Sequence, residues 1–181
     1  MKITIEYKPV EKLTKKEIDE LNYYRVKDWG EPARCDFKKE DKKAIFVIIK
    51  NGGKLKAYGM LKPVRVEFRG EKYDILGMGR GRAIEKGKEY GRLLSAARIY
   101  YIKKTGKTAI AFTGTHNIGF FEKAGFRVEK NFIKRFAYKN PKTGKIIYDE
   151  DGHVVCYEGK DKLISKILKA KGYAYTDVDF W

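Results

Sequence analysis

The sequence has few of the residues that build disulfide frameworks and metal centres. Its 181 residues include two cysteines, Cys35 and Cys156, and two histidines, His116 and His153. The cysteines form no Cys-x-x-Cys pair, and two histidines are too few for a metal cluster, so we expect no metal site and reduced thiols. Cys35 lies in an expected loop, which leaves both an inert cysteine and a nucleophilic thiol open.

Long apolar runs and low-complexity tracts are missing too. The longest apolar run, residues 44–49, is far too short to cross a bilayer and is typical of a buried strand. Residues 1–7 alternate like a strand and contain no apolar stretch of the signal-peptide type. We therefore expect no membrane span, a cytoplasmic location, and one domain over residues 1–181.

Positive charge is abundant, with 41 lysines and arginines against 24 acidic residues, giving a net charge of +17. Such a charge attracts nucleic acid or phosphorylated cofactors. However, lysine and glutamate are also abundant on the surfaces of many heat-adapted proteins. Residues 132–139 interleave basic and aromatic side chains, which keeps nucleic acid open as a partner, although the same alternation fits a core strand.

The order of patterns predicts an α+β domain. Thr14-Lys15-Lys16-Glu17 is a capping box that begins a helix, and Gly30 ends it. Asn51-Gly52-Gly53 predicts a hairpin within an antiparallel meander. The strands are expected at 44–50, 54–68, 72–82, 108–112, 126–138 and 145–157, and the later helices at 88–104, 117–124 and 161–171. An apolar tail follows and is expected to pack. These elements predict a mixed, mainly antiparallel sheet flanked by helices.

The helix expected at 88–104 has its apolar face at Leu93, Leu94, Ala97 and Tyr101, with Arg98 elsewhere. A basic, glycine-containing turn precedes it. Free amides and the positive dipole end make the start of a helix a site for anions, and glycine lets the backbone approach a phosphate closely. The candidate residues of this turn are Gly79, Arg80, Gly81, Lys86, Gly87, Lys88, Glu89, Tyr90, Gly91 and Arg92.

This turn, followed by Asn117 and by Phe121-Glu122-x-x-Gly125-Phe126, resembles the GNAT superfamily of N-acetyltransferases over roughly residues 44–138. The resemblance implies a GNAT-like sheet, with acetyl-CoA bound at the turn between the fourth strand and the third helix, and with Asn117 and Phe121 beside it. It also leaves a homodimer open. The sequence departs from the family in two places: Glu89 stands where a glycine is expected, and Phe121 replaces the tyrosine that protonates the departing thiolate.

The family chemistry implies direct attack of an amine on the thioester, whose oxygen is polarised by a backbone amide near Met78. The glutamate that serves as base in some relatives corresponds to Gly77 here. Asp74 is the leading replacement, with Glu67 and the acidic residues near the C-terminus as alternatives.

The C-terminal third is similar to the aminoglycoside 2′-N-acetyltransferases in Pro141-x-Thr143-Gly144, in the acidic turn 149–152 and in the final Asp179-Phe180-Trp181. This resemblance implies that the substrate is bound by Glu150, Asp151, Asp179 and Trp181. Independently, two acidic segments in a cationic chain would form an anionic site for an amine if they met.

These observations support an acetyl-CoA-dependent N-acetyltransferase acting on a primary amine of the aminoglycoside or polyamine type. Two alternatives stay open. One is an acetyltransferase acting on an amine of tRNA or a ribosomal protein, and the other is a non-catalytic nucleic-acid-binding relative.

Overall fold

A long antiparallel hairpin, β3 (Lys54–Phe68) and β4 (Glu71–Ala83), forms the centre of the sheet in the computed structural model, which describes residues 2–179. Strand β2 (Ile45–Asn51) pairs antiparallel with β3 across the hairpin at Gly52 and Gly53, and β1 (Ile3–Pro9) pairs with β2. This half of the sheet is the predicted meander.

The other strands extend the sheet on both sides of the hairpin. Beyond β4 lie β5 (Ala109–Thr113), β9 (His153–Tyr157) and β6 (Arg127–Glu129), and beyond β3 lie β10 (Ala174–Thr176), β7 (Phe136–Lys139) and β8 (Ile146–Tyr148). The β4–β5 and β10–β7 pairs are parallel and the others antiparallel. The predicted mixed, mainly antiparallel sheet is therefore confirmed.

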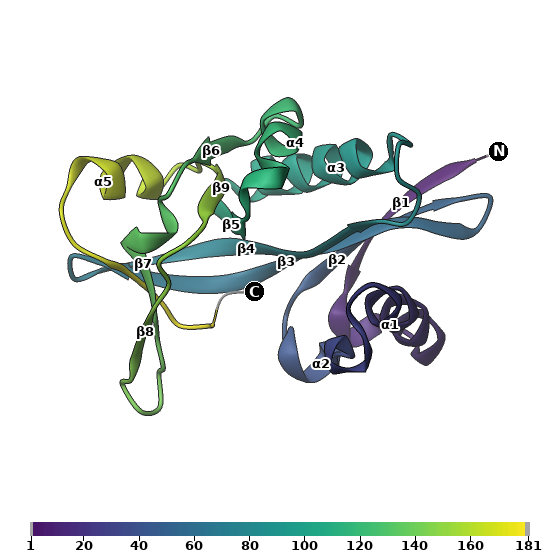
Figure 1. The fold of residues 1–181 in the computed structure, drawn as a ribbon, viewed down its shortest axis with the longest axis horizontal. Helices are drawn as coiled ribbons and strands as arrows, with labels where there is room; N and C mark the ends of the chain where they lie inside the picture. Colours follow the sequence, from purple (N-terminus) through teal and green to yellow (C-terminus); the bar gives the residue numbers. More distant parts are fainter. Residues whose placement is uncertain (1, 180–181) are drawn as a thin grey trace.

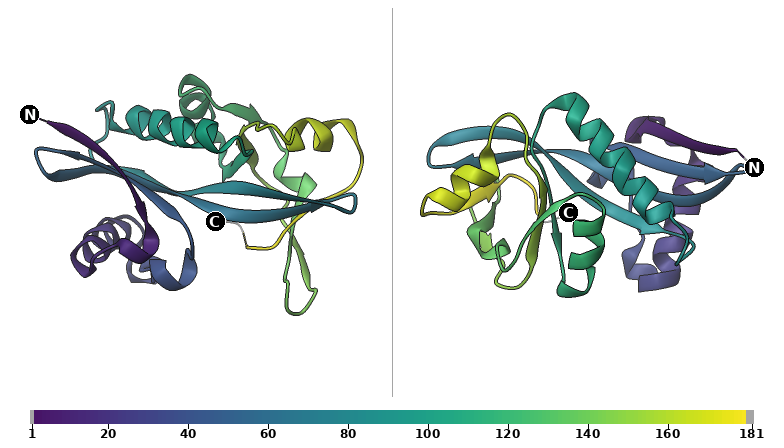
Figure 2. Two further views of the ribbon diagram at one scale, coloured as in Figure 1. Left: turned by 180° about the vertical axis from the view of Figure 1, so that it is seen from behind. Right: turned by 90° about the horizontal axis from the view of Figure 1, so that it is seen from above.

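Helices cover both faces of the curved sheet (Figures 1 and 2). On one face lie α1 (Lys15–Trp29) and α2 (Phe37–Glu40), and on the other lie α3 (Tyr90–Thr105), α4 (Ile118–Lys123) and α5 (Leu163–Lys169). Short 3₁₀ turns occur at Val10–Lys12, Glu31–Ala33, Thr115–Asn117 and Ile133–Arg135. The described part of the chain contains no helix long and apolar enough to cross a membrane.

The capping box of α1 is formed as predicted. The Thr14 hydroxyl accepts a hydrogen bond from the Glu17 amide at 3.2 Å, and the Glu17 carboxylate accepts one from the Thr14 amide at 2.9 Å. Lys8 of β1 also binds this carboxylate at 2.7 Å. One side chain therefore satisfies the helix start and ties α1 to the edge of the sheet.

These contacts predict a loss of stability in acid. Burial raises the pKa of Glu17, but the hydrogen bonds from Lys8 and Thr14 outweigh it and lower that pKa from 4.5 to about 2. The folded state thus holds its proton less tightly than the unfolded state, so the stabilisation is present above pH 4.5 and is lost as the pH falls toward 2. Urea unfolding at pH 6 and pH 3 should show Glu17→Gln to be roughly 1–2 kcal/mol less stable at pH 6 and closer to wild type at pH 3.

The matched control for this experiment is Asp19→Asn, which removes an exposed carboxylate from the same helix. It should leave the difference between the two pH values unchanged. An equal cost of Glu17→Gln at both pH values would contradict the assignment of the charge.

Two of the predicted strands are interrupted. Residues 126–138 turn at Asn131, which has φ 53°, a left-handed conformation that asparagine tolerates. The Asn131 amide donates to Nδ1 of buried His153 at 2.9 Å, which fixes the turn. Residues 145–157 turn at Gly152, which has φ 145°. The second interruption coincides with the acidic turn 149–152.

The tail packs as expected in its described part. Ala174 and Thr176 of β10 are buried, and β10 fills the gap between β3 and β7. Trp181 lies outside the described residues.

Candidate functional site

The site begins where β4 and β5 part. The two strands pair only at Leu76–Ala109 and Gly77–Ile110. A little further on, the register between β3 and β4 shifts between Tyr58 and Met60, and Arg80 has φ 52°. This bulge bends β4 away from its neighbour and resets which face of the sheet each later side chain occupies.

A pocket of about 370 Å³ lies beside this opening, between the end of β4, the first turns of α3, and α4. We call it the α3 pocket. It is lined by Gly81, Arg82, Ala83, Lys86, Gly91, Leu94, Ser95, Arg98, Asn117, Phe120 and Phe121. The structure thus brings together five of the predicted cofactor residues: Gly81, Lys86, Gly91, Asn117 and Phe121. The lining contains three cations and no carboxylate, so the pocket is suited to an anionic ligand.

The three cations differ in their surroundings. The Arg82 guanidinium pairs with Asp28 and lies over the ring of Trp29 at 5.6 Å, so its charge lies against α1 on the face of the sheet opposite α3. Lys86 is exposed, whereas Arg98 is buried. The side chain of Glu89, the residue before α3, forms no capping hydrogen bond. The first amides of α3 therefore have no side-chain acceptor from the cap residue and can bind an anion.

The other predicted residues of the turn lie outside the lining of the α3 pocket. Glu89 forms an exposed ion pair with Arg92 at 3.0 Å, which partly neutralises its charge. The Tyr90 hydroxyl accepts a hydrogen bond from Asn51 at 2.9 Å. Gly87 has φ 73°, a conformation that favours glycine, and Lys88 is exposed. Glu89 stands where the family has a glycine, but it lies outside the pocket lining and therefore adds no carboxylate to the pocket.

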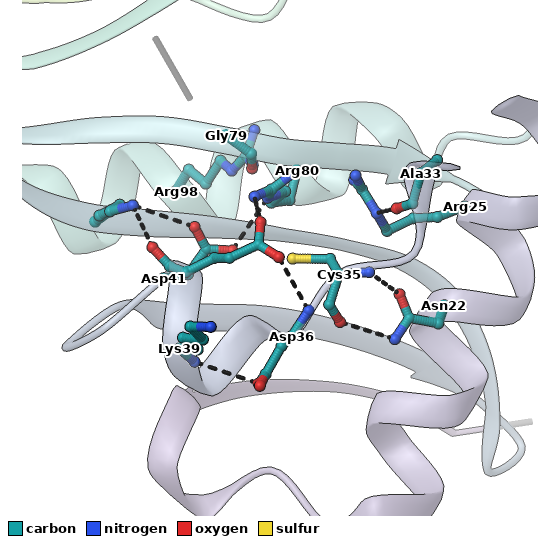
Figure 3. A network of polar contacts seen from close by, with 12 residues as sticks. Asn22, Arg25, Ala33, Cys35, Asp36, Lys39, Asp41, Gly79, Arg80 and Arg98 are labelled. Atoms are coloured by element: carbon teal, nitrogen blue, oxygen red, sulfur yellow. Dashed lines mark hydrogen bonds and ion pairs between the residues drawn. The ribbon is translucent and has the colours of Figure 1, made fainter. Parts of the chain in front are cut away.

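The bulge sends Arg80 to the opposite face of the sheet. Its side chain pairs with buried Asp41 at 3.0 Å and with Glu40 at 3.2 Å (Figure 3). Gly79, next to it, presents its carbonyl to Arg98. The structure thus separates Arg80 from Gly81, although both were predicted to bind the cofactor.

Arg80 faces a second pocket of about 550 Å³, which we call the Arg80 pocket. It is lined by Glu40, Asp41, Lys62, Arg80, Tyr138, Asn140, Pro141, Lys142, Asp177, Val178 and Asp179. Asp179 therefore lines the same pocket as Glu40 and Asp41. Glu150 and Asp151 are exposed between β8 and β9 and are not part of this lining.

The two predicted catalytic positions differ in their environment. Asp74 is exposed, pairs with Arg65 at 3.3 Å, and lines neither pocket. The Met78 side chain is buried in the core, which leaves its backbone for chemistry. The Leu76 amide donates to Thr108 of the chain entering β5, at 2.9 Å. Since amides alternate along a strand, the Met78 amide points to the same side, where the Gly77–Ile110 pair still holds β5. The opening begins beyond this pair, at Gly79 and Arg80.

The structure decides two questions that the sequence left open. Burial raises the pKa of Cys35 to about 12, so its thiol is inert at neutral pH. Phe132 and Phe136 are buried in the core under α5, and they do not form an exposed stacking surface for bases.

Comparison with known proteins identifies the fold. No protein-family model and no curated relative matches the sequence. Among solved structures, YhbS of Escherichia coli, a GNAT-family N-acetyltransferase in complex with CoA, has a TM-score of 0.61 at 12% identity, over 97% of this chain and 89% of that one. ElaA of E. coli has a TM-score of 0.56 at 13% identity, over 86% and 98%. A Bacillus subtilis acetyltransferase in complex with CoA has a TM-score of 0.55 at 18% identity, over 87% and 99%.

At these identities the comparison establishes the fold, which is that of the GNAT N-acetyltransferases, as the sequence predicted. None of these structures supports the closer resemblance to the aminoglycoside 2′-N-acetyltransferases.

Proposed function

We propose that this protein is an acetyl-CoA-dependent N-acetyltransferase that acts on a primary amine. The observation that carries the proposal is the α3 pocket, which places the cations Lys86 and Arg98 and no carboxylate at a helix start beside two parting strands. The CoA phosphates bind the first amides of α3 and Lys86, and the arm of the cofactor runs along the pocket toward the opening. YhbS and the B. subtilis enzyme, which share the fold, are both in complex with CoA, and this supports acetyl-CoA as the co-substrate.

In the reaction, the amine nitrogen attacks the acetyl carbonyl, and a backbone amide of the Met78-Gly79-Arg80 segment at the opening binds the developing oxyanion. A C–N bond forms, the C–S bond breaks, and the sulfur leaves with the electron pair. The amine reaches the thioester from the Arg80 pocket, because Arg80 and Gly81 are neighbours on β4 that face different pockets. Since Asp74 lines neither pocket, we place the acceptor of the amine proton among the carboxylates of the Arg80 pocket.

The Arg80 pocket also bears on the acceptor. Four carboxylates line it, against three cations, within a chain of net charge +17. Two of the carboxylates, Asp177 and Asp179, lie in the tail that the sequence singled out as part of an anionic site. A small molecule with more than one amino group fits this lining, so polyamines and aminoglycosides form the first panel of acceptors.

The test of the proposal is binding of acetyl-CoA. At 100 times its dissociation constant, acetyl-CoA should stabilise the protein by about 2.7 kcal/mol, which thermal unfolding will show as a rise in Tm of roughly 5–10 °C. Lys86→Glu should weaken binding roughly tenfold or more, because it places a carboxylate at the phosphate subsite. Lys104→Glu makes the same charge change on the exposed far end of α3 and should leave binding unchanged.

Release of free CoA thiol is then measured with the acceptor panel. Binding of RNA without any binding of acetyl-CoA would contradict the proposal and favour a nucleic-acid-binding function.

A further inference from the structure

Arg98 is the only arginine of the α3 pocket that is buried, at 6% exposure. Its guanidinium lies in a slot that two glycines leave open on the sheet. A Cβ at Gly59 would lie 2.0 Å from one terminal nitrogen of Arg98, and a Cβ at Gly81 would lie 3.0 Å from the other. The backbone of β3 and β4 therefore makes room for this cation at the bulge.

The cation has no counter-charge among the described residues. Its contact is with the Gly79 carbonyl, and its buried Nε–H has no hydrogen-bond partner (Figure 3). Burial lowers the pKa of Arg98 to about 10, so the group remains charged at neutral pH. A buried charge without an opposite charge is strongly unfavourable, and such groups are usually paired. The slot is thus prepared for an anion that the protein itself does not supply.

The position of Arg98 indicates which anion this is. Arg98 follows Gly91 by two turns on the same side of α3, about 10 Å further along the helix axis. A phosphate bound at the helix start by Lys86 therefore does not reach it. The partner of Arg98 is at the other end of a long anionic ligand, beside Gly79 and Gly81 of β4, the strand that borders the opening to β5.

We propose that Arg98 is a catalytic residue that stabilises the thiolate of CoA as it leaves; this rests on the proposed function. When the C–S bond breaks, the electron pair stays on sulfur, and the guanidinium balances the new charge while keeping its own proton. Neither the other basic residues of the lining nor the residue at the family's tyrosine position supplies a buried, unpaired cation. Phe121 has no hydroxyl, Lys86 is at the exposed mouth, and Arg82 is already paired with Asp28.

A cation beside the sulfur lowers the pKa of the bound CoA thiol. The thiolate absorbs in the ultraviolet, as do the 13 tyrosines when they ionise, so the pH titration of the protein–CoA complex is read as its difference from that of the desulfo-CoA complex. The thiols of the protein do not interfere, because burial raises the pKa of Cys35 and of Cys156 to about 12. We expect the bound thiol to titrate at least one pH unit below free CoA, which is a tenfold or greater gain in thiolate at neutral pH.

In Arg98→Met the bound thiol should titrate like free CoA, whereas Arg98→Lys should retain part of the shift. Lys104→Met, which removes a charge from the exposed end of the same helix, should behave as wild type. Desulfo-CoA, which lacks the sulfur, should bind wild type and Arg98→Met equally, and this also shows that the variant is folded. If Arg98→Met does not fold, the wild-type and Arg98→Lys titrations decide the matter.

An unshifted thiol in the wild-type complex, or a full shift in Arg98→Met, would overturn the role of Arg98 while leaving the acetyltransferase proposal intact. Failure of both CoA and acetyl-CoA to bind would overturn the proposed function as well.

Discussion

Gly159→Ala is expected to lower the free energy of unfolding by roughly 3–4 kcal/mol. Gly159 lies between β9 and α5 and crosses directly over the chain that enters β5. A Cβ at this position would lie 2.3 Å from the Lys107 carbonyl carbon and 2.3 Å from the Thr108 amide nitrogen. Both are backbone atoms, so no side-chain rotation relieves the clash. The two segments must move apart.

Separation of these segments breaks a buried polar network. The Gly159 amide donates to the Thr108 hydroxyl at 2.9 Å, and the Lys160 amide donates to the Gly106 carbonyl at 2.9 Å. The Thr108 hydroxyl and amide in turn donate to the Asp161 carboxylate. Thr108 is fully buried, so each bond lost leaves a polar group without water. This network fixes the start of β5, and therefore one side of the opening at the site.

Urea unfolding followed by circular dichroism measures the effect. Gly119→Ala is the matched control, since a Cβ at this helical glycine of α4 has no atom within 4 Å. It should be neutral or up to about 1 kcal/mol more stable, because alanine favours the helix. A Gly159→Ala protein within about 0.5 kcal/mol of wild type would show that the two segments do not cross as closely as described.

The sequence predicts local structure well wherever the determining residues are neighbours. The capping box at Thr14 and Glu17, the hairpin at Gly52 and Gly53, and the end of α3 at Gly106 are all where the pattern places them. Each is determined by contacts within a few residues, and such contacts are visible in sequence spacing.

The arrangement of the site is less predictable, because it depends on one bulge and on distant pairs. Strand alternation counted from Met78 would place Arg80 on the α3 face and Gly81 on the opposite face, and the register shift in β4 reverses this assignment. In the same way, Glu40 and Asp41 line one pocket with Asp179, although they are far apart in the sequence. The acidic turn at Glu150 has the composition expected of an anionic site. In the structure, however, the carboxylates that line a pocket with Asp179 are Glu40, Asp41 and Asp177.

The burial of Arg98 is visible in the sequence as helical spacing. Its neighbours one turn before and after on α3 are Leu94 and Ile102, and both are buried. Spacing of four residues puts all three on one side of the helix, so the arginine falls within an apolar stripe. The expectation that a charged side chain points to solvent outweighed this spacing. What the sequence could not show is the pair of glycines on β3 and β4 that accommodates the side chain.

That pairing gives the second large expected effect, a strong coupling between Gly59 and Arg98. Gly59→Ala alone should destabilise the protein by roughly 2–4 kcal/mol, because the new methyl group occupies the position of the guanidinium and displaces a buried cation. In an Arg98→Ala background the space is vacant, and the same methyl group should cost less than about 1 kcal/mol. Urea unfolding of the four proteins gives the coupling energy, expected at about 2–3 kcal/mol.

Gly53→Ala provides the comparison, since this glycine has φ 77° but a Cβ there meets no atom within 4 Å. Its cost comes from backbone strain alone and should be the same with either residue at position 98. Additive effects of Gly59→Ala and Arg98→Ala would mean that the guanidinium does not lie in the slot, and the thiolate role of Arg98 would lose its structural basis. A large coupling would show that β3 and β4 give up side-chain volume at the bulge to accommodate the Arg98 guanidinium.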